Sequence, residues 1–197
     1  MNKKNRSFVA VGVTGTFGSG KTTVLKLASG MKIPVIDADS IVSMLYRKPS
    51  VKHRIKSEFR TLDREKLAEI VFSSPKKRRI LESILHPLVK KEVSARLNAL
   101  KKKGKKTAFV EIPLLFESGM HNIFAFTIAV HCPQKTLLRR LKKKGFSGKQ
   151  ALRRIKAQLS SRKKIKSSDF VINNGLSIAS TKRQVKNLIE KISGELS

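Results

Sequence analysis

The sequence has a single cysteine, Cys132, a single tyrosine, Tyr46, and no tryptophan among its 197 residues. One cysteine excludes a disulfide within the chain and any metal cluster held by several thiolates. Apolar runs stay well short of the roughly 18 residues that would cross a bilayer. The basic start of the chain leads into a glycine-rich stretch rather than a small-residue cleavage site. We therefore expect a cytoplasmic protein without a membrane partner.

Acidic residues are also scarce, with 13 Asp and Glu against 44 Lys and Arg, for a formal net charge of +31. Such an excess favours a polyanionic partner, and nucleic acid is the first candidate. The basic runs are interrupted by apolar residues at helical spacing, however, and no aromatic set alternates with them as a single-strand binding surface requires. Solvated helix faces explain them better. Nucleic acid is then expected to bind only non-specifically, at low salt.

Short apolar runs alternate with helical patterns over most of the chain. Strands are predicted at residues 8–13, 34–37, 107–111, 124–130 and 170–172. Helices are predicted at residues 22–29, 41–45, 133–143, 147–160 and 177–192. This alternation predicts an α/β fold, a parallel sheet with helices on both faces.

One block interrupts the alternation, because residues 51–103 show helical periodicity alone. Pro75 and Pro87 both stand where a first-turn proline is typical, which predicts that each begins a separate helix. The block is therefore expected to be an all-helical insert.

The segment Gly15–Thr22 matches the phosphate-binding pattern G-x-x-x-x-G-K-[ST] at every position, between a predicted strand and a predicted helix. Its glycines allow backbone N–H groups to converge on phosphate oxygens at the positive end of the following helix. Lys21 is expected to reach the β- and γ-phosphates, and the Thr22 hydroxyl to bind Mg²⁺. The expected ATP contacts are Gly15, Gly18, Ser19, Gly20, Lys21, Thr22 and Thr23.

Two other classes of P-loop protein fit less well. A GTPase would need an Asn-Lys-x-Asp stretch to read guanine, and the sequence has none. An energy-coupling ATPase is usually larger and has an apolar strand ending in a carboxylate, for which Glu111 is the nearest candidate. A small kinase fits best.

Five short stretches follow the P-loop in a characteristic order. They are Val35–Asp39, Leu85–Val89, Glu111–Glu117, Arg154–Gln158 and Asp169–Gly175. Together they resemble the dephospho-CoA kinase family, and the resemblance runs from about residue 9 to residue 192. It implies transfer of the γ-phosphate of ATP, with Mg²⁺, to the ribose 3′-hydroxyl of dephospho-CoA, the last step of coenzyme A synthesis. The alternatives are a nucleoside monophosphate kinase and a basic P-loop ATPase that binds nucleic acid.

The resemblance also implies how the chain is organised. We expect a monomer with one P-loop kinase-like domain, residues 1–197, built as a parallel sheet between helices. Its expected parts are a nucleotide-binding core (8–48 and 105–197), a helical substrate-side insert (49–104) and a lid (140–166). Residues 46–62 are shorter than the family pattern, which leaves open how the pantetheine arm is bound.

Site residues follow from the same resemblance. Asp39, the second acid of Asp-Ala-Asp, is expected to be the general base that contacts the acceptor hydroxyl; its alternative role is a helix N-cap. His86 is expected beside the acceptor, or as an ordinary helix-end cap.

Arg139 and Arg154 match lid-region arginines that stabilise the transferring phosphoryl group. Asn174 is expected near the adenine, although a plain strand-to-helix turn explains it equally well. Glu111 and Glu117 are candidates for a supporting role around Mg²⁺ or for structure alone.

Overall fold

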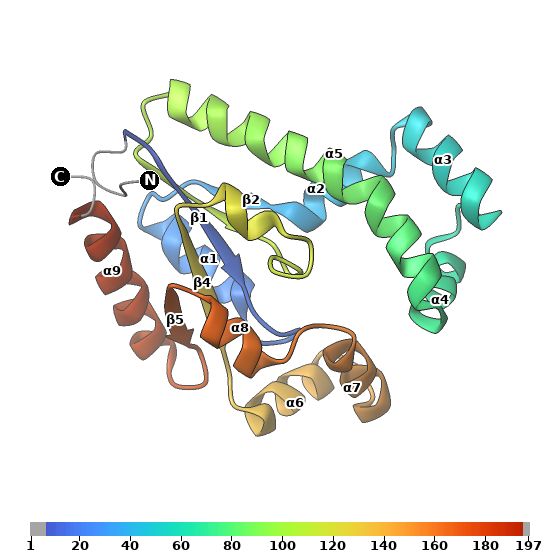
Figure 1. The fold of residues 1–197 in the computed structure, drawn as a ribbon. Coiled ribbons are helices and arrows are strands. Elements are labelled where there is room, and N and C mark those ends of the chain that lie inside the picture. The colour runs from blue at the N-terminus through green and yellow to red at the C-terminus, as the bar shows by residue number, and fades with distance from the viewer. Residues whose placement is uncertain (1–6, 195–197) are drawn as a thin grey trace. The chain divides into compact units, whose positions relative to one another are not determined.

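The computed structural model describes residues 7–194, and within them five strands form one sheet in the order β2-β3-β1-β4-β5 (Figure 1). The strands are β1 (Val9–Thr14), β2 (Val35–Asp37), β3 (Thr107–Glu111), β4 (Phe126–His131) and β5 (Phe170–Asn173). β1 pairs in parallel with both β3 and β4, and β4 pairs in parallel with β5. The predicted α/β fold is confirmed.

The chain divides into two compact units, the second of which is Asp37–Arg96. The first unit comprises the described residues up to Ile36 and from Leu97 onward. Besides the sheet it contains α1 (Lys21–Gly30), a 3₁₀ turn (Met120–Ile123), α6 (Gln134–Lys143), α7 (Gly148–Lys156), α8 (Ser161–Ser167) and α9 (Ile178–Gly194). The second unit contains α2 (Ala38–Leu45), α3 (Pro49–Phe59), α4 (Arg64–Ser73) and most of α5 (Pro75–Lys102). No described helix has the length and apolar character needed to span a membrane.

The core of the first unit forms around β1. Val9, Val11 and Val13 alternate along this strand, so they share one face of the sheet, and all three are buried. They belong to one apolar cluster with residues of α1 and α9, including Val24 and Val185. A strand at the centre of a parallel sheet is buried on both faces, which is why its sequence is almost continuously apolar.

The second unit has its own apolar cluster. Its buried members come from α3, α4 and α5 and are Val51, Ile55, Phe59, Leu67, Ile84 and Leu85. The α4 helix begins after Asp63, whose Oδ1 accepts a hydrogen bond from the backbone N of Glu65 at 2.8 Å.

The prediction that Pro87 begins a new helix is wrong. Pro75 does start α5, but Pro87 lies inside that 28-residue helix. A proline in a helix interior removes one backbone hydrogen bond and costs about 3 kcal/mol. Apolar residues on both sides of Pro87, such as Leu85 and Val89, are buried along the same helix. Their packing offsets this cost.

The single helix predicted over residues 147–160 is also wrong beyond Lys156. α7 ends there, and α8 starts after Ser160, whose hydroxyl oxygen accepts a hydrogen bond from the backbone N of Lys163 at 3.3 Å. Serine is a favoured N-cap, so Ser160 favours a new start over continuation of the preceding helix.

Candidate active site

The P-loop connects β1 to α1 where the chain turns at the carboxyl edge of the sheet. Because β1 lies between β3 and β4, the loop occupies the point where successive connections diverge, the usual ligand position in such sheets. Gly18 and Gly20 have φ of +84° and +91°, which side chains with a Cβ rarely adopt. A Cβ on Gly20 would also collide with the side-chain amide of Asn174. The loop shape therefore requires these two glycines.

Lys21 is the first residue of α1 and is only 8% exposed. Its Nζ donates to the carbonyl oxygen of Gly15 at 3.1 Å and lies 4.0 Å from Oε1 of Glu111 at the end of β3. The ammonium group is thus held back over the loop, where it can neutralise phosphate charge. The next residue, Thr22, is exposed and offers its hydroxyl at the start of the same helix.

Two hydroxyls inside the P-loop have no hydrogen-bond partner among the described residues. They are Oγ1 of Thr16 and Oγ of Ser19, and both residues are at least 95% buried. A buried hydroxyl without a partner costs about 1–3 kcal/mol. An oxygen-rich anion in the loop would satisfy such groups together with the backbone amides, so the loop fits a phosphate chain.

Asn174 fixes the loop from the end of β5. Its side-chain nitrogen donates to the carbonyl oxygen of Ser19 at 2.8 Å, and its side-chain oxygen accepts from the Thr181 hydroxyl at 3.1 Å. The residue is 1% exposed. The structure therefore brings Asn174 to the P-loop as a support, and its contact with adenine stays a prediction.

Arg140 lies beside the P-loop, whereas Arg139, the residue favoured by the resemblance, is exposed on α6. A Cβ on Gly20 would lie 3.4 Å from Nη1 of Arg140. The spacing of apolar residues in the sequence already indicates that Arg139 faces away from the core. Leu137 and Leu141 form the buried stripe of α6, and Arg139 is two residues from each of them, which places it on the opposite side of the helix.

The same arginine contacts the one cysteine of the chain. Nη1 of Arg140 lies 3.6 Å from Sγ of Cys132, which follows β4 and is 5% exposed. Burial raises the pKa of the Cys132 thiol, and the two arginines of α6 oppose that rise.

Arg154 of α7 reaches the P-loop through an aromatic contact. Its guanidinium carbon lies 5.2 Å from the ring centre of Phe17 and 4.9 Å from that of Phe146. The two rings meet edge to face at 5.2 Å. Stacking uses the flat face of a guanidinium and leaves its in-plane N–H groups for a bidentate anion.

In the second unit, Asp37 and not Asp39 caps α2. Oδ1 of Asp37 accepts from the backbone N of Asp39 at 2.9 Å, and Asp39 is an exposed residue of the first turn. The capping alternative for Asp39 is therefore wrong. His86 is half-buried inside α5, so its alternative as a helix-end cap is wrong as well.

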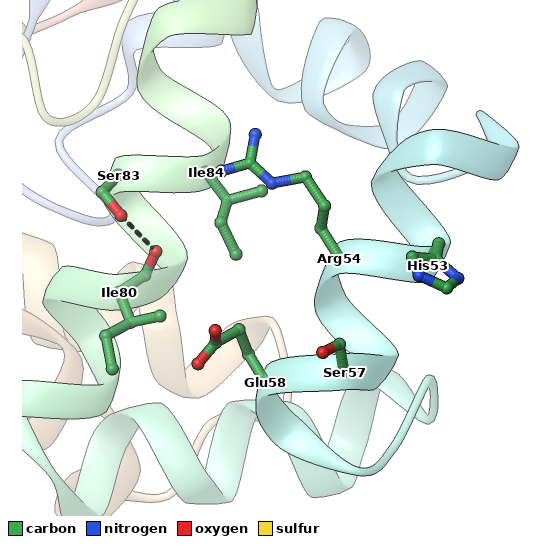
Figure 2. Close-up of a pocket in the computed structure, with 7 residues that line it drawn as sticks. All are labelled: His53, Arg54, Ser57, Glu58, Ile80, Ser83 and Ile84. Atoms are coloured by element: carbon green, nitrogen blue, oxygen red, sulfur yellow. Dashed lines mark hydrogen bonds between the residues drawn. The ribbon is translucent and has the colours of Figure 1, made fainter.

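The second unit also has a small pocket of about 200 Å³ between α3 and α5, which the sequence did not indicate (Figure 2). Its lining residues are His53, Arg54, Ser57, Glu58, Ile80, Ser83 and Ile84. The Ser83 hydroxyl donates to the carbonyl oxygen of Ile80 at 2.8 Å, so it is used within its own helix.

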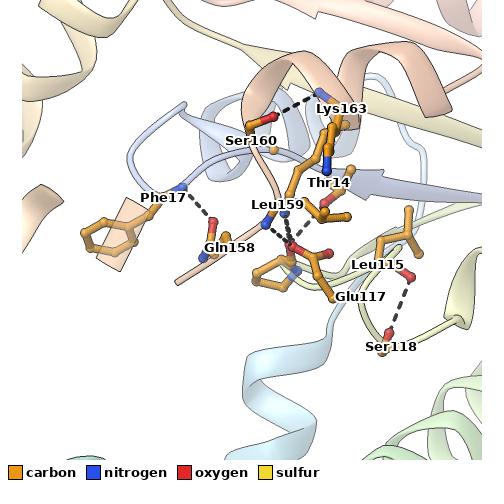
Figure 3. Close-up of polar contacts among 12 residues, drawn as sticks. Thr14, Phe17, Leu115, Glu117, Ser118, Gln158, Leu159, Ser160 and Lys163 are labelled. Carbon is orange, nitrogen blue, oxygen red and sulfur yellow. Dashed lines mark hydrogen bonds and ion pairs between the residues drawn. The ribbon is translucent and has the colours of Figure 1, made fainter. Parts of the chain in front are cut away.

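Three supporting residues were not recognised from the sequence as parts of one network. Lys164 belongs to the run Arg162–Lys164, one of the basic runs for which the sequence favours a solvated helix face, yet it is 1% exposed. Its Nζ lies 3.1 Å from Oε1 of Glu117. Burial lowers the pKa of Lys164, while the Glu117 carboxylate opposes that shift. Gln158 accepts a hydrogen bond from the backbone N of Phe17 at 3.2 Å (Figure 3). Each of these contacts joins residues that are far apart in the sequence, so residue spacing alone did not indicate them.

Comparisons with known proteins agree with this geometry. A family model described as dephospho-CoA kinase matches residues 9–180. A dephospho-CoA kinase of Bacillus thuringiensis subsp. konkukian is 36% identical over 193 residues, covering 93% of this chain and 96% of its own.

Two solved structures are similar over nearly the full length. The dephospho-CoA kinase of Campylobacter jejuni is 30% identical with a TM-score of 0.69, covering 94% of this chain and 97% of its own. The Thermus thermophilus protein TT1252 is 30% identical with a TM-score of 0.83, covering 94% and 98%.

Proposed function

Since the chain belongs to the dephospho-CoA kinase family, we propose that its P-loop and Asp39 divide the work of phosphorylating dephospho-CoA with ATP. The activity is that of a phosphotransferase in coenzyme A biosynthesis, and a nucleoside monophosphate kinase is not favoured. The observation that carries the proposal is the glycine loop at the end of β1, with Lys21 held over it.

At the nucleotide end, the amides of residues 15–20 and the N-terminus of α1 would bind the phosphate chain. Lys21 would neutralise the β- and γ-phosphates, and Thr23 would contact the phosphate nearest the nucleoside. Asn174 would support the loop and approach the adenine. Mg²⁺ would be held by the Thr22 hydroxyl and by the nucleotide itself, and it supplies positive charge to the phosphate oxygens.

At the acceptor end, Asp39 would accept the proton of the ribose 3′-hydroxyl as that oxygen attacks the γ-phosphorus and the bond to ADP breaks. His86 would contact dephospho-CoA. Support comes from the motif that contains Asp39 and from Asp37, which already performs the capping task.

In and directly beside the lid, which we propose to be residues 140–166, arginines would stabilise the charge of the transferring group. The resemblance favours Arg139 and Arg154, and we add Arg140 for its position beside Gly20. Preorganised cations are the main source of rate enhancement in phosphoryl transfer.

We further propose the domain plan stated above, with its core at 8–48 and 105–197 and its insert at 49–104. The enzyme would act in the cytoplasm, as a monomer, on ATP and dephospho-CoA.

A coupled assay of ADP release from ATP and Mg²⁺ tests the function, with dephospho-CoA compared with AMP, CMP and GMP as acceptors. We expect turnover with dephospho-CoA and its loss in Lys21→Ala. A faster reaction with any of the three nucleotides would contradict the assignment.

A further inference from the structure

We propose that Gln158 is a positioning residue for the P-loop and that the buried Lys164 anchors the segment that carries it. Gln158 would act by holding the backbone of Phe17, so that the loop keeps the shape that receives ATP. The inference rests on the proposed function, because it concerns the same nucleotide site.

The contact between Gln158 and Phe17 joins residues 141 positions apart in the sequence. Oε1 of Gln158 accepts from the backbone N of Phe17 at 3.2 Å, in the first half of the loop (Figure 3). The ring of Phe17 packs on Phe146 and Arg154. Both the main chain and the side chain of Phe17 are therefore fixed by the segment that follows α6.

The segment with Gln158 is anchored on the loop after β3. The backbone N of Leu159, next to Gln158, donates to Oε1 of Glu117 at 2.9 Å. The same carboxylate oxygen lies 3.1 Å from Nζ of Lys164 in α8. One carboxylate thus ties down both ends of the stretch from Leu159 to Lys164.

The anchor continues to the residue that precedes the P-loop. Lys164 also donates to the carbonyl oxygen of Pro113, and the Thr14 hydroxyl donates to that same oxygen at 3.1 Å. Thr14 is the last residue of β1. Two points of the chain, Thr14 and Phe17, are thereby fixed by one connected set of contacts, with Gly15 and Thr16 between them.

Stability of the fold alone does not require a lysine at position 164. Burying an ion pair is costly, and apolar residues of similar volume often serve stability as well or better. A polar network does supply direction, because hydrogen bonds fix the orientation of the groups they join. Preorganised donors bind a ligand more tightly than mobile ones, since less ordering remains to be done on binding.

The first test replaces Gln158 with Met, which keeps the length and removes the acceptor. We expect amide exchange of Phe17 to accelerate about tenfold and the KM for ATP to rise about tenfold, the value of one hydrogen bond. The KM for dephospho-CoA and the melting temperature should stay near the parent values. Gln158→Glu keeps an acceptor oxygen and should restore most of the ATP affinity.

Gln134→Met, at an exposed site on α6, is the matched control and should change none of these readouts. Unchanged Phe17 exchange and ATP KM in Gln158→Met would overturn the proposal. Equal rises of both KM values with a lower melting temperature would overturn it too, because they indicate a general defect.

A second pair of variants tests the anchor. Lys164→Met should accelerate amide exchange at Leu159 as well as Phe17, whereas Lys163→Met on the exposed side of α8 should not. If Lys164→Met does not fold, the Gln158 variants still test whether Gln158 positions the P-loop. Amide hydrogen exchange, and ATP affinity measured by calorimetry, can both be determined without dephospho-CoA. These two readouts therefore distinguish failure of this proposal from failure of the proposed function.

Discussion

Asp37 and Asp39 have chemically identical side chains, but they occupy different positions relative to the start of α2. Asp37 lies at the end of β2, where its carboxylate can reach the first free amides of α2, and it caps that helix. Asp39 lies within the first turn and is exposed. Because of their positions relative to the start of α2, Asp37 is a structural capping residue and Asp39 is left as the candidate base.

Asp39→Asn should keep ATP affinity and lower kcat by about 10²–10⁴-fold, the usual contribution of general-base assistance. The amide has nearly the same shape but accepts a proton poorly. Steady-state kinetics with dephospho-CoA and calorimetry with ATP give the two quantities. Turnover near the parent value would remove Asp39 from the role.

Among the arginines, we expect Arg140→Ala and Arg154→Ala to lower kcat about 100-fold, as loss of a placed charge typically does. Arg139→Ala should have a smaller effect, because Arg139 is exposed on the far side of α6 from its buried stripe. Lys102→Ala, at the exposed end of α5, is the control for general charge. Equal losses in all four variants would mean that total charge, not position, matters.

At the scale of elements, α5 shows how packing overrides a local signal. The helix passes through Pro87 because the apolar residues around it are buried, whereas Pro75 stands at the first position, where its missing N–H costs nothing. Sequence alone treats these two prolines alike. Burial along the helix distinguishes them.

Pro87→Ala should therefore raise the free energy of unfolding by about 1–3 kcal/mol, because alanine restores the hydrogen bond and relieves the ring clash. The matched change Pro75→Ala should stay within about 0.5 kcal/mol of the parent. Urea denaturation followed by circular dichroism measures both. A gain in Pro75→Ala as large as in Pro87→Ala would show that proline position is irrelevant here.

The whole molecule has a strongly uneven charge. No Asp or Glu stands between Glu117 and Asp169, the stretch that holds α6, α7 and α8 with many of their exposed cations. A family whose substrates are polyanions benefits from such a field, because it raises the local concentration of substrate. The same field attracts any other polyanion.

Binding of a single-stranded oligonucleotide should accordingly be measurable at 50 mM salt and fall at least a thousandfold by about 200 mM, as counterion release requires for several phosphate contacts. Fluorescence anisotropy over a salt series tests this. Tight binding that persists at the higher salt would favour a dedicated nucleic-acid function instead.

Local patterns were sufficient for much of this protein. The apolar run before Gly15, the motif Gly15–Thr22 and the alternation of strands with helices predict the sheet, the P-loop and the class of reaction. These features depend on residues within about a dozen positions of one another. A short stretch of sequence therefore contains the information that determines them.

Only the tertiary structure decided which polar residues meet. Gln158 with Phe17, Lys164 with Glu117 and Asn174 with Ser19 join segments brought together by sheet order and helix packing. A sequence records the donors and acceptors but not the path that pairs them. Burial accounts for the remaining differences. Lys164 is buried although its neighbours in sequence are basic, and α5 continues past Pro87 because the apolar residues around that proline are buried.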